Sequence, residues 1–600
     1  MSQSGGVLLG NALGNARSSS SRRKALRALT VSVAILAVSL TFAEAPAATT
    51  CASPPAVFPE SSITPGMAGT GLTAVQGSAP VSFDIQVIGI LPNALLPGFD
   101  LVIFKITGPQ AFLDQAHGVA SGMSGSPIYI GGQLAGAVSY SFGLAADPMV
   151  GLFTPAQQMV DLTALPTGSA TSLPSSVAVT PQVRVAVADA AKVPVNSVPT
   201  TVQRLAIPLG VSGLSDQRAQ RLQSIIDNHG LPFHVYRAGG AASASAATIN
   251  PMPLAAGEPL AAELSNGDVT FAGIGTATFA CGDLNVGWGH SFFFQGPSSF
   301  AMGGASVITI VNDVSGLFGP FKILVPTDLR GTVVQDRLAG LMGQVGTVPT
   351  AMPVTTTFTN NDDGKTRTGR TDIFYQQDFW GPEIVYEHVF QNLLLVFDHF
   401  GKGTLSLSYT IQGLRQDGVT PFTVHNSNMV ASGYDAFRAA NRLLTALYRL
   451  EFNRAEEVTF TSVEASGEIT DQQLVGEIVR VRTSSSLQRA LRDRPVLRAK
   501  RGSRITLEVM LRPAGGGPPE TATLRMRVPH RADGFELISF RGGRARQRID
   551  RHLGFKQLVT ILNGGEHPND LIASGLGRRL VQKQDVVVDG QAAVTVKVVG

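Results

Sequence analysis

The sequence has few of the features that build helical bundles or metal sites. It holds only two Trp and two Cys, charged residues make up 15% of the chain, and long amphipathic runs are scarce. It has no His-Glu-x-x-His and no Cys-x-x-Cys motif, so it predicts no metal site and implies no cofactor. These absences argue against a helical protein and against a metalloenzyme.

Glycine and proline are abundant instead, with 65 and 35 residues. Because both residues favour turns and interrupt helices, we expect a mainly β protein with few helices. A single hydrophobic core stops growing near roughly 250 to 300 residues, which predicts two or three domains. The net charge of +4 is small, and the arginines between 541 and 551 lack interleaved aromatics, so no nucleic-acid partner is expected.

The N-terminus has the layout of a secretory signal peptide. Basic residues between 22 and 27 precede an apolar stretch at 28–42, and small residues follow at 43–48. The apolar stretch is shorter than the roughly 20 residues that span a bilayer, although an uncleaved anchor is the alternative. We expect residues 1–47 to be removed and the protein to be exported. The mature protein would then be secreted, periplasmic or associated with the cell envelope.

The only cysteines of the chain are Cys51 and Cys281. In an oxidising compartment they could form one disulfide, since two cysteines pair in only one way. Cys281 also stands just before Gly282-Asp283, a hairpin-turn signal, and two unpaired thiols are the alternative. The sequence leaves both states open.

Composition divides the chain into four parts after the signal peptide region. Residues 59–160 alternate between apolar and polar side chains as half-buried strands do, and residues 269–354 form a second β-rich stretch. Between them, residues 161–268 are rich in Ala, Pro, Ser and Thr and predict a linker with one helix, at 216–228. Residues 355–600 predict a β-rich, sandwich-like region that includes an immunoglobulin-like module.

The feature with the clearest chemistry is the hexapeptide Gly122-Met123-Ser124-Gly125-Ser126-Pro127, which precedes a strand. Glycines allow a tight turn that exposes the Ser124 hydroxyl and directs backbone N–H groups at the oxyanion formed during acyl transfer. The amides of Gly122 and Ser124 are the candidate oxyanion hole. Taken alone, a short Gly/Ser segment is more often an ordinary turn.

A longer pattern around this hexapeptide resembles the signature of the SpoIVB serine peptidase family. The hexapeptide is followed by a short hairpin and a Gly136-Ala137-Val138 strand, with Pro65-Gly66-Met67 upstream and Gly151-Leu152-Phe153 downstream. This resemblance spans residues 52–354. It implies a chymotrypsin-like double β-barrel peptidase domain in which Ser124 is the nucleophile.

The resemblance also implies the general base. Gly287-Trp288-Gly289-His290 is similar to the Gly-His element that carries the family's catalytic histidine, which makes His290 the candidate base. His117 lies nearer to the serine and is expected to be structural. The segment 333–346 resembles one that follows the histidine in the family.

Two departures from the family pattern stand out. The serine precedes the histidine here, whereas the family has the opposite order, so the two halves look permuted. The family's aspartate is also missing, because the chain has Ile106-Thr107-Gly108 where Ile-Thr-Asp is expected. Asp114 and Asp283 are candidate substitutes, and a surface carboxylate is the alternative for each.

These features lead to an expected function. The chain is predicted to be an exported serine endopeptidase that cleaves a protein substrate through an acyl-enzyme on Ser124, with no cofactor. The alternative is an inactive scaffold or binding protein of the cell envelope that keeps the barrel and its serine turn.

Overall fold

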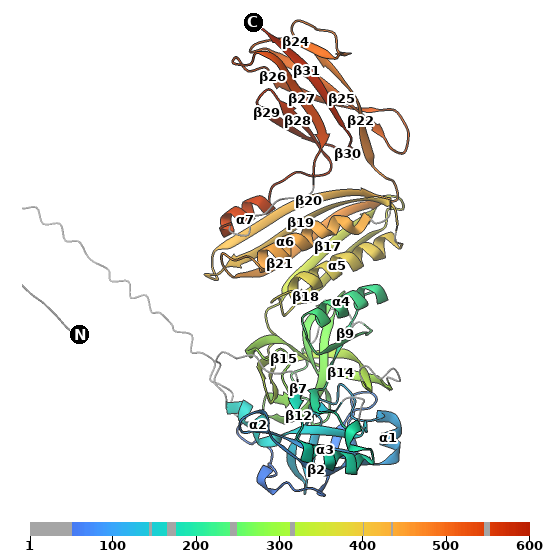
Figure 1. The fold of residues 1–600 in the computed structure, drawn as a ribbon, viewed down its shortest axis with the longest axis vertical. Helices are drawn as coiled ribbons and strands as arrows, with labels where there is room; N and C mark the ends of the chain where they lie inside the picture. Colours follow the sequence, from blue (N-terminus) through green and yellow to red (C-terminus); the bar gives the residue numbers. More distant parts are fainter. Residues whose placement is uncertain are drawn as a thin grey trace, which may run out of the picture. The chain divides into compact units, whose positions relative to one another are not determined.

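The computed structural model describes residues 51–142, 147–164, 176–239, 249–312, 319–399, 401–433, 436–544 and 553–600. The predicted signal peptide lies outside these ranges. Among the described residues, no helix combines the length and the apolar character needed to cross a bilayer. The fold is mainly β, as predicted (Figure 1). The strand pairings form two closed barrels, which are followed by further sheets.

The first barrel contains the serine segment. Its six strands close in the order β4-β1-β2-β3-β6-β5, because β5 pairs back with β4. The alternation predicted at 81–87 buries Phe83, Ile85 and Val87 in the barrel. Gly131 and Gly132 adopt positive φ values and form the tight turn between β4 and β5. The strands are β1 (Ala68–Thr73), β2 (Val81–Leu96), β3 (Phe99–Gly108), β4 (Pro127–Ile130), β5 (Gln133–Ser141) and β6 (Val150–Pro155).

The segment 161–268 is not the linker that its composition predicts. Strands β7 (Ser176–Ala178) and β8 (Thr201–Arg204) extend the first sheet, and helix α3 (Pro181–Ala191) lies between them in the chain. The predicted helix is confirmed as α4 (Asp216–Asn228), and the Ser215 side chain caps it by accepting from the Arg218 N–H. Strands β9 (Ile207–Val211) and β10 (Phe233–Arg237) pair with each other in parallel, and β9 joins the second sheet antiparallel to β12.

The second barrel contains the histidine segment. Its strands close in the order β12-β13-β16-β15-β14-β11, because β11 pairs with both β12 and β14. The Gly282-Asp283 turn joins β12 to β13, as the sequence predicts. The strands are β11 (Pro259–Gly267), β12 (Phe271–Cys281), β13 (Leu284–Gly287), β14 (Gly296–Val311), β15 (Phe321–Arg337) and β16 (Gly340–Val345).

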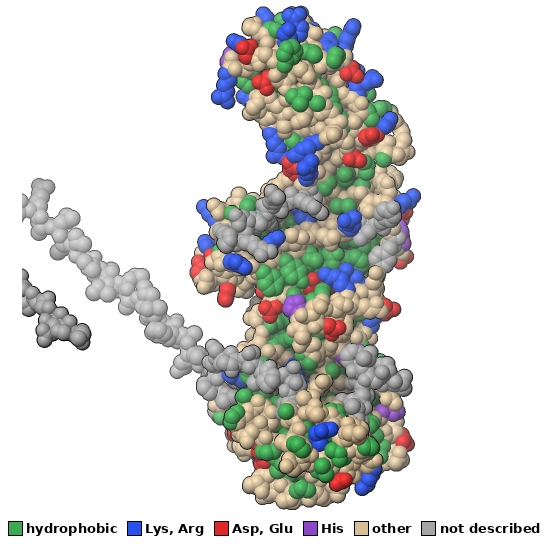
Figure 2. Space-filling view, in the orientation of Figure 1, with side chains coloured by type: hydrophobic (Ala, Val, Ile, Leu, Met, Phe, Trp, Pro, Cys, Tyr) green, Lys and Arg blue, Asp and Glu red, His purple; other side chains and the backbone are tan. Residues whose placement is uncertain are grey.

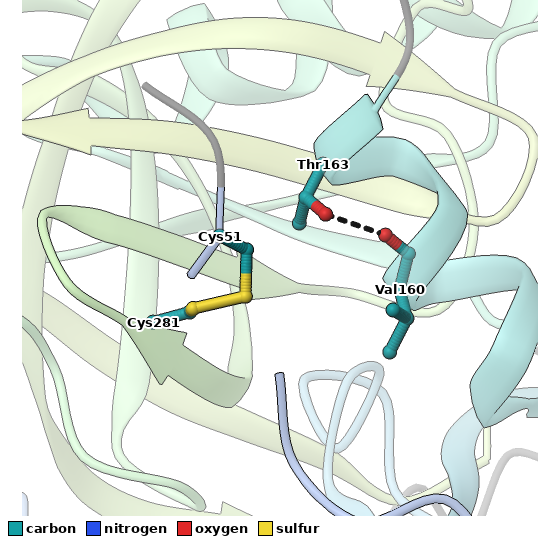
Figure 3. Close-up of a disulfide and its surroundings, with 4 residues drawn as sticks. All are labelled: Cys51, Val160, Thr163 and Cys281. Atoms are coloured by element: carbon teal, nitrogen blue, oxygen red, sulfur yellow. Dashed lines mark hydrogen bonds between the residues drawn. A yellow bond between two sulfur atoms is a disulfide. The ribbon is translucent and has the colours of Figure 1, made fainter. Parts of the chain in front are cut away.

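Cys51 and Cys281 form a disulfide, which the sequence left open. It joins the start of the described chain to the end of β12. Figure 3 shows it near Val160 and Thr163, which belong to the short helices α2 (Ala156–Val160) and η3 (Asp161–Ala164). The bond therefore links the segment that precedes the first barrel to the second barrel.

The sheet of the second barrel continues beyond residue 354, where the sequence analysis placed a boundary. Strand β18 pairs with β11, and the order runs on as β18-β17-β21-β19-β20. Helices α5 (Trp380–Phe397) and α6 (Asn441–Glu451) pack on this sheet. The strands are β17 (Met352–Asn360), β18 (Thr366–Ile373), β19 (Gly403–Arg415), β20 (Pro421–Ser432) and β21 (Val458–Thr470).

The last part of the chain, from β22 onward, forms two sheets that enclose one apolar core. One sheet contains β22 (Val475–Ser484), β23 (Arg492–Asp493), β25 (Arg504–Pro513), β26 (Glu520–Arg527) and β30 (Val587–Asp589). The other contains β24 (Val496–Lys500), β31 (Gln591–Val599), β27 (Gly534–Gly542), β28 (Asp570–Gly575) and β29 (Arg578–Lys583). Helix α7 (Phe555–Leu562) packs instead against the preceding sheet, on β20.

Candidate active site

The serine turn lies between helix α1 (Gln110–Ala116) and strand β4. Gly122 and Gly125 adopt φ values of +93° and +95°, which side chains rarely tolerate, so the turn depends on glycine at both positions. The fully buried Met123 anchors the turn, and its backbone N–H donates to the Ala120 carbonyl. This geometry places Ser124 at the tip of the turn.

Strand β12 of the second barrel holds the turn from the other side. The Thr276 N–H donates to the Ser124 carbonyl at 2.7 Å, and the Thr276 hydroxyl donates to the Gly122 carbonyl at 2.9 Å. The Thr278 hydroxyl donates to the Gly125 carbonyl at 2.7 Å. The nucleophile candidate therefore sits at the interface of the two barrels.

His290 follows β13 through a tight backbone bend. Trp288 and Gly289 both have positive φ, and Trp288 is fully buried. A side chain at Gly289 would lie 2.9 Å from the Val138 carbonyl of the first barrel, so only glycine allows this approach. The bend carries His290 across to the serine turn.

The structure brings the two candidate residues together. The Ser124 Oγ and the His290 Nε2 are 2.8 Å apart, and the His290 Nδ1 lies 2.9 Å from the Ser291 carbonyl oxygen. Because a carbonyl only accepts, Nδ1 must carry the proton, which leaves Nε2 of a neutral ring as an acceptor. The Ser124 hydroxyl then donates to Nε2, as a serine nucleophile and its base require.

Two backbone N–H groups of the serine turn have no hydrogen-bond partner among the residues that the structure describes. They belong to Gly122 and Ser124, while the neighbouring N–H of Gly125 donates to the Val138 carbonyl at 2.7 Å. Unpaired donors near a buried hydroxyl are suited to a developing oxyanion. These are the two amides that the sequence analysis singled out.

Comparison with known proteins bears on the same segment. The family model described as SpoIVB peptidase S55 matches residues 38–160. Over these residues the chain is similar to the S55 peptidases. The family is one of serine peptidases, and the match includes the serine turn but not His290. No curated protein and no solved structure matches the chain.

The S55 segment does not supply a carboxylate to His290. Asp114 is exposed on α1, where its carboxylate accepts from the Gln110 side chain, and it makes no hydrogen bond with His290. Asp283 is exposed in the turn between β12 and β13. Neither candidate replaces the aspartate of the S55 pattern, because the hydrogen-bond partner of the His290 Nδ1 in the described structure is the Ser291 carbonyl.

The sequence did not single out two charged residues near the ring, the half-buried Arg204 and the buried Asp336. Arg204 of β8 donates to the Ser291 carbonyl at 2.9 Å, so it shares the acceptor that holds His290. Asp336 of β15 accepts from the backbone N–H groups of Phe292, Phe293 and Gln295. The only signal for Asp336 was its place in the segment 333–346.

Burial shifts the pKa values of this cluster. Desolvation, with the Arg204 charge as a second cause, lowers the pKa of His290 to about 3. Desolvation raises the pKa of Asp336 to about 6, against the effect of the backbone N–H groups that it accepts from. At neutral pH the ring is therefore neutral and able to accept a proton, and Asp336 is ionised.

A buried lysine lies against the other side of the serine turn. Lys322 is fully buried, and its Nζ donates to the Thr73 hydroxyl at 2.7 Å. Its backbone N–H donates to the Ser121 carbonyl at 3.0 Å, and burial lowers its pKa to about 7. A side chain at Gly122 would meet the Lys322 methylenes at 3.2 Å, so the lysine chain packs against the candidate oxyanion hole.

The candidate dyad is buried in this structure. Ser124 is 3% exposed and His290 is 0% exposed. A substrate carbonyl needs access to the serine hydroxyl, so binding must be accompanied by a local movement that uncovers Ser124. No group of His, Cys, Asp and Glu in the described part of the chain is arranged to hold a metal ion.

Proposed function

We propose that this chain is an exported serine endopeptidase that cleaves a protein substrate through an acyl-enzyme on Ser124. The observation that carries the proposal is the 2.8 Å contact between Ser124 Oγ and His290 Nε2. It joins a turn that matches the S55 family to a histidine that lies 166 residues away in the sequence.

In the proposed reaction, His290 Nε2 takes the proton as Ser124 Oγ attacks the substrate carbonyl. The amides of Gly122 and Ser124 donate to the oxyanion. The imidazolium then gives its proton to the leaving amine, and a water molecule, deprotonated by His290, hydrolyses the acyl-enzyme. No cofactor takes part in these reaction steps.

The proposed dyad should be slow. A carboxylate behind the histidine stabilises the imidazolium that forms during the reaction, and its loss lowers turnover by about 10⁴ in a full triad. Here the Ser291 carbonyl orients the ring, and Arg204 places a positive charge beside it. The Arg204 charge opposes formation of the imidazolium.

Export is supported by two separate features. Residues 1–47 have the signal-peptide layout, and the Cys51–Cys281 disulfide belongs to an oxidising compartment. Both are compatible with a protein that is secreted or held in the cell envelope.

Two observations favour a second candidate, an inactive scaffold on the same barrels. Ser124 and His290 are almost completely buried, and the S55 aspartate is absent. A protein that has lost catalysis could retain the buried contact as part of its barrel interface.

Hydrolysis of an unfolded protein separates the two candidates. Residues 49–600 should be incubated with a reduced, unfolded protein, and new termini should be identified by mass spectrometry. The peptidase predicts cleavage that is lost in Ser124→Ala and kept in Ser126→Ala, because the Ser126 hydroxyl donates to Thr73 and not to His290. Cleavage that persists in Ser124→Ala would identify a contaminant, and the scaffold predicts none.

A further inference from the structure

The chain divides its charge unevenly. Residues 475–600 hold 23 of the 47 Lys and Arg but only 11 of the 43 Asp and Glu, a formal net charge of +12. Residues 51–474 hold 19 basic and 31 acidic residues, a net charge of −12. The whole-chain value of +4 hides this division. Figure 2 shows lysine and arginine side chains over the C-terminal module.

Both sheets of the C-terminal module contain ion-paired arginines, and on the sheet that contains β27 these are Arg541 and Arg579, which share Glu566. On the sheet that contains β22, β25 and β26, many arginines are neutralised by carboxylates. The pairs are Arg480 with Asp493, Arg482 with Glu508, and Arg512 with Glu477. Around these three pairs the face presents a mixed charge pattern.

The opposite sheet has an outer face that we call the β27 face. Its register places Arg498 of β24 beside Lys597 of β31, and Lys597 beside Phe535 of β27. Lys500 is two residues further along β24. All three cations are exposed, and none forms an ion pair with another described residue. Among the described residues of these five strands, Asp570 is the only carboxylate whose register position lies on the β27 face, and it is buried.

Apolar side chains are exposed on the same face. Phe535 is 66% exposed and Leu537 is 59% exposed, although large apolar side chains are normally buried. They alternate with the buried Ile538 and Phe540, so both point away from the core. The Lys597 ammonium lies 5.3 Å from the centre of the Phe535 ring. The β27 face thus presents cations and apolar groups together on one sheet surface.

We propose that the β27 face docks on an anionic lipid bilayer. Arg498, Lys500 and Lys597 would contact lipid phosphates, and Phe535 and Leu537 would enter the headgroup region. A membrane surface offers both negative charge and an adjoining apolar layer, and each juxtamembrane Lys or Arg strengthens binding severalfold. This proposal does not depend on catalysis by Ser124.

Nucleic acid matches the face less well. Single strands bind through rows of aromatic rings on which bases stack, and this face has one ring beside an aliphatic Leu537. A second copy of the chain could offer the acidic residues of 51–474 to these cations. Both occupants are distinguishable in the test below.

The test uses residues 49–600 carrying Ser124→Ala, so that no self-cleavage intervenes. Co-sedimentation is measured with vesicles of phosphatidylcholine alone and of phosphatidylcholine mixed with phosphatidylglycerol. We expect binding to the mixed vesicles at ~0.1 M salt and its loss at ~1 M, where the Debye length falls from about 10 to about 3 Å. The double variant R498E/K597E should weaken binding at least tenfold.

Matched variants separate this face from net charge. The variant R504E/R527E makes the same charge change on the other sheet, where the two arginines are cross-strand neighbours, and should weaken binding less than threefold. The variant F535S/L537S should reduce binding at low salt while leaving the thermal unfolding temperature unchanged. K597R should bind as the parent does.

Four results would overturn the proposal. The first is the absence of binding to mixed vesicles, and the second is an equal loss of vesicle binding in R498E/K597E and R504E/R527E. The third is tighter binding to a DNA oligonucleotide than to the vesicles. The fourth is salt-sensitive self-association that R498E/K597E abolishes, in the absence of any vesicle binding. Circular dichroism of each variant checks that it is folded.

Discussion

At the scale of single residues, the site depends on how His290 is held. Its Nδ1 donates to the Ser291 carbonyl, which also accepts from Arg204, so a neutral acceptor stands where the S55 pattern has an aspartate. The carbonyl selects the tautomer that accepts from Ser124 but provides little stabilisation to a charged ring. Asp336 acts on the ring indirectly, because its carboxylate accepts from the Phe292 N–H and so fixes the backbone that follows Ser291.

The pH dependence of the serine's reactivity should therefore reflect Asp336 rather than His290. As pH falls through about 6, Asp336 takes up a proton and loses an acceptor for the N–H groups of Phe292, Phe293 or Gln295. His290, with a pKa lowered to about 3, stays neutral over this range. We expect the rate of labelling by a fluorophosphonate probe to fall below pH 6 in the wild type.

The variant Asp336→Asn isolates the cause of this fall. It should react more slowly than the wild type at pH 8, by roughly tenfold, yet show no further decrease between pH 8 and pH 5. A decrease with a midpoint near the ordinary histidine value of about 6.5 in this variant would mean that His290 itself titrates there. That result would contradict the assigned environment of the ring.

The sequence identified part of this cluster. Ser124 and His290 follow from the resemblance to the S55 motif, the two amide donors follow from the glycine turn, and the structure brings them together. The partner of Nδ1 could not be predicted, because any residue can supply a backbone carbonyl. Arg204 lies in a segment whose composition suggested a linker, so nothing marked it as part of the site.

At the scale of elements, the serine turn depends on its contact with β12. A side chain at Gly125 would lie 1.9 Å from the Thr276 carbonyl and 2.3 Å from the Trp288 nitrogen, both backbone atoms. The position also has a φ of +95°. The turn therefore needs glycine for two separate reasons.

We expect Gly125→Ala to reduce the free energy of unfolding by more than about 3 kcal/mol and to abolish labelling of Ser124. The control is Gly132→Ala, which has a φ of +80° but no atom within 4 Å of the new methyl group. It should cost only about 1 to 2 kcal/mol and leave labelling intact. Equal thermal shifts in the two variants would show that contact with β12 is unimportant.

Helices show which elements a sequence pattern reveals. Helix α4 was predicted because it has a serine cap, a terminal glycine and one apolar stripe. Helix α5 was missed because most of its residues are buried, including Glu383 and Glu387, so no polar face breaks the pattern. Those two carboxylates pair with Arg221 and Arg218 of α4. Such long-range pairs leave no local signal in the sequence.

At the scale of the whole molecule, the site needs both barrels, since Ser124 comes from one and His290 from the other. The resemblance predicted a double barrel, and the strand order confirms two closed rings. Composition misjudged 161–268, because the segment also contains β11, a strand of the second barrel whose pairing with β14 and β18 is not local. The continuous sheet across residue 354 was also hidden, since strand pairing between β11 and β18 is not local.

The disulfide should stabilise this arrangement, because it ties Cys51 to the second barrel across 230 residues. Removing a link of this kind lowers the free energy of unfolding by roughly 2 to 5 kcal/mol. We expect Cys281→Ser to unfold at a lower temperature than the wild type in calorimetry. A reductant should lower the wild-type value toward that of the variant and leave the variant unchanged. A wild type that is insensitive to reductant would show that the bond contributes nothing.

Covalent labelling by a fluorophosphonate probe, followed by peptide mapping, tests the central claim most directly. The account predicts that the probe modifies Ser124 of folded residues 49–600, and that Ser124→Ala and His290→Ala both abolish the modification. Failure to label folded wild type, or equal labelling of His290→Ala, would contradict an activated serine paired with this histidine.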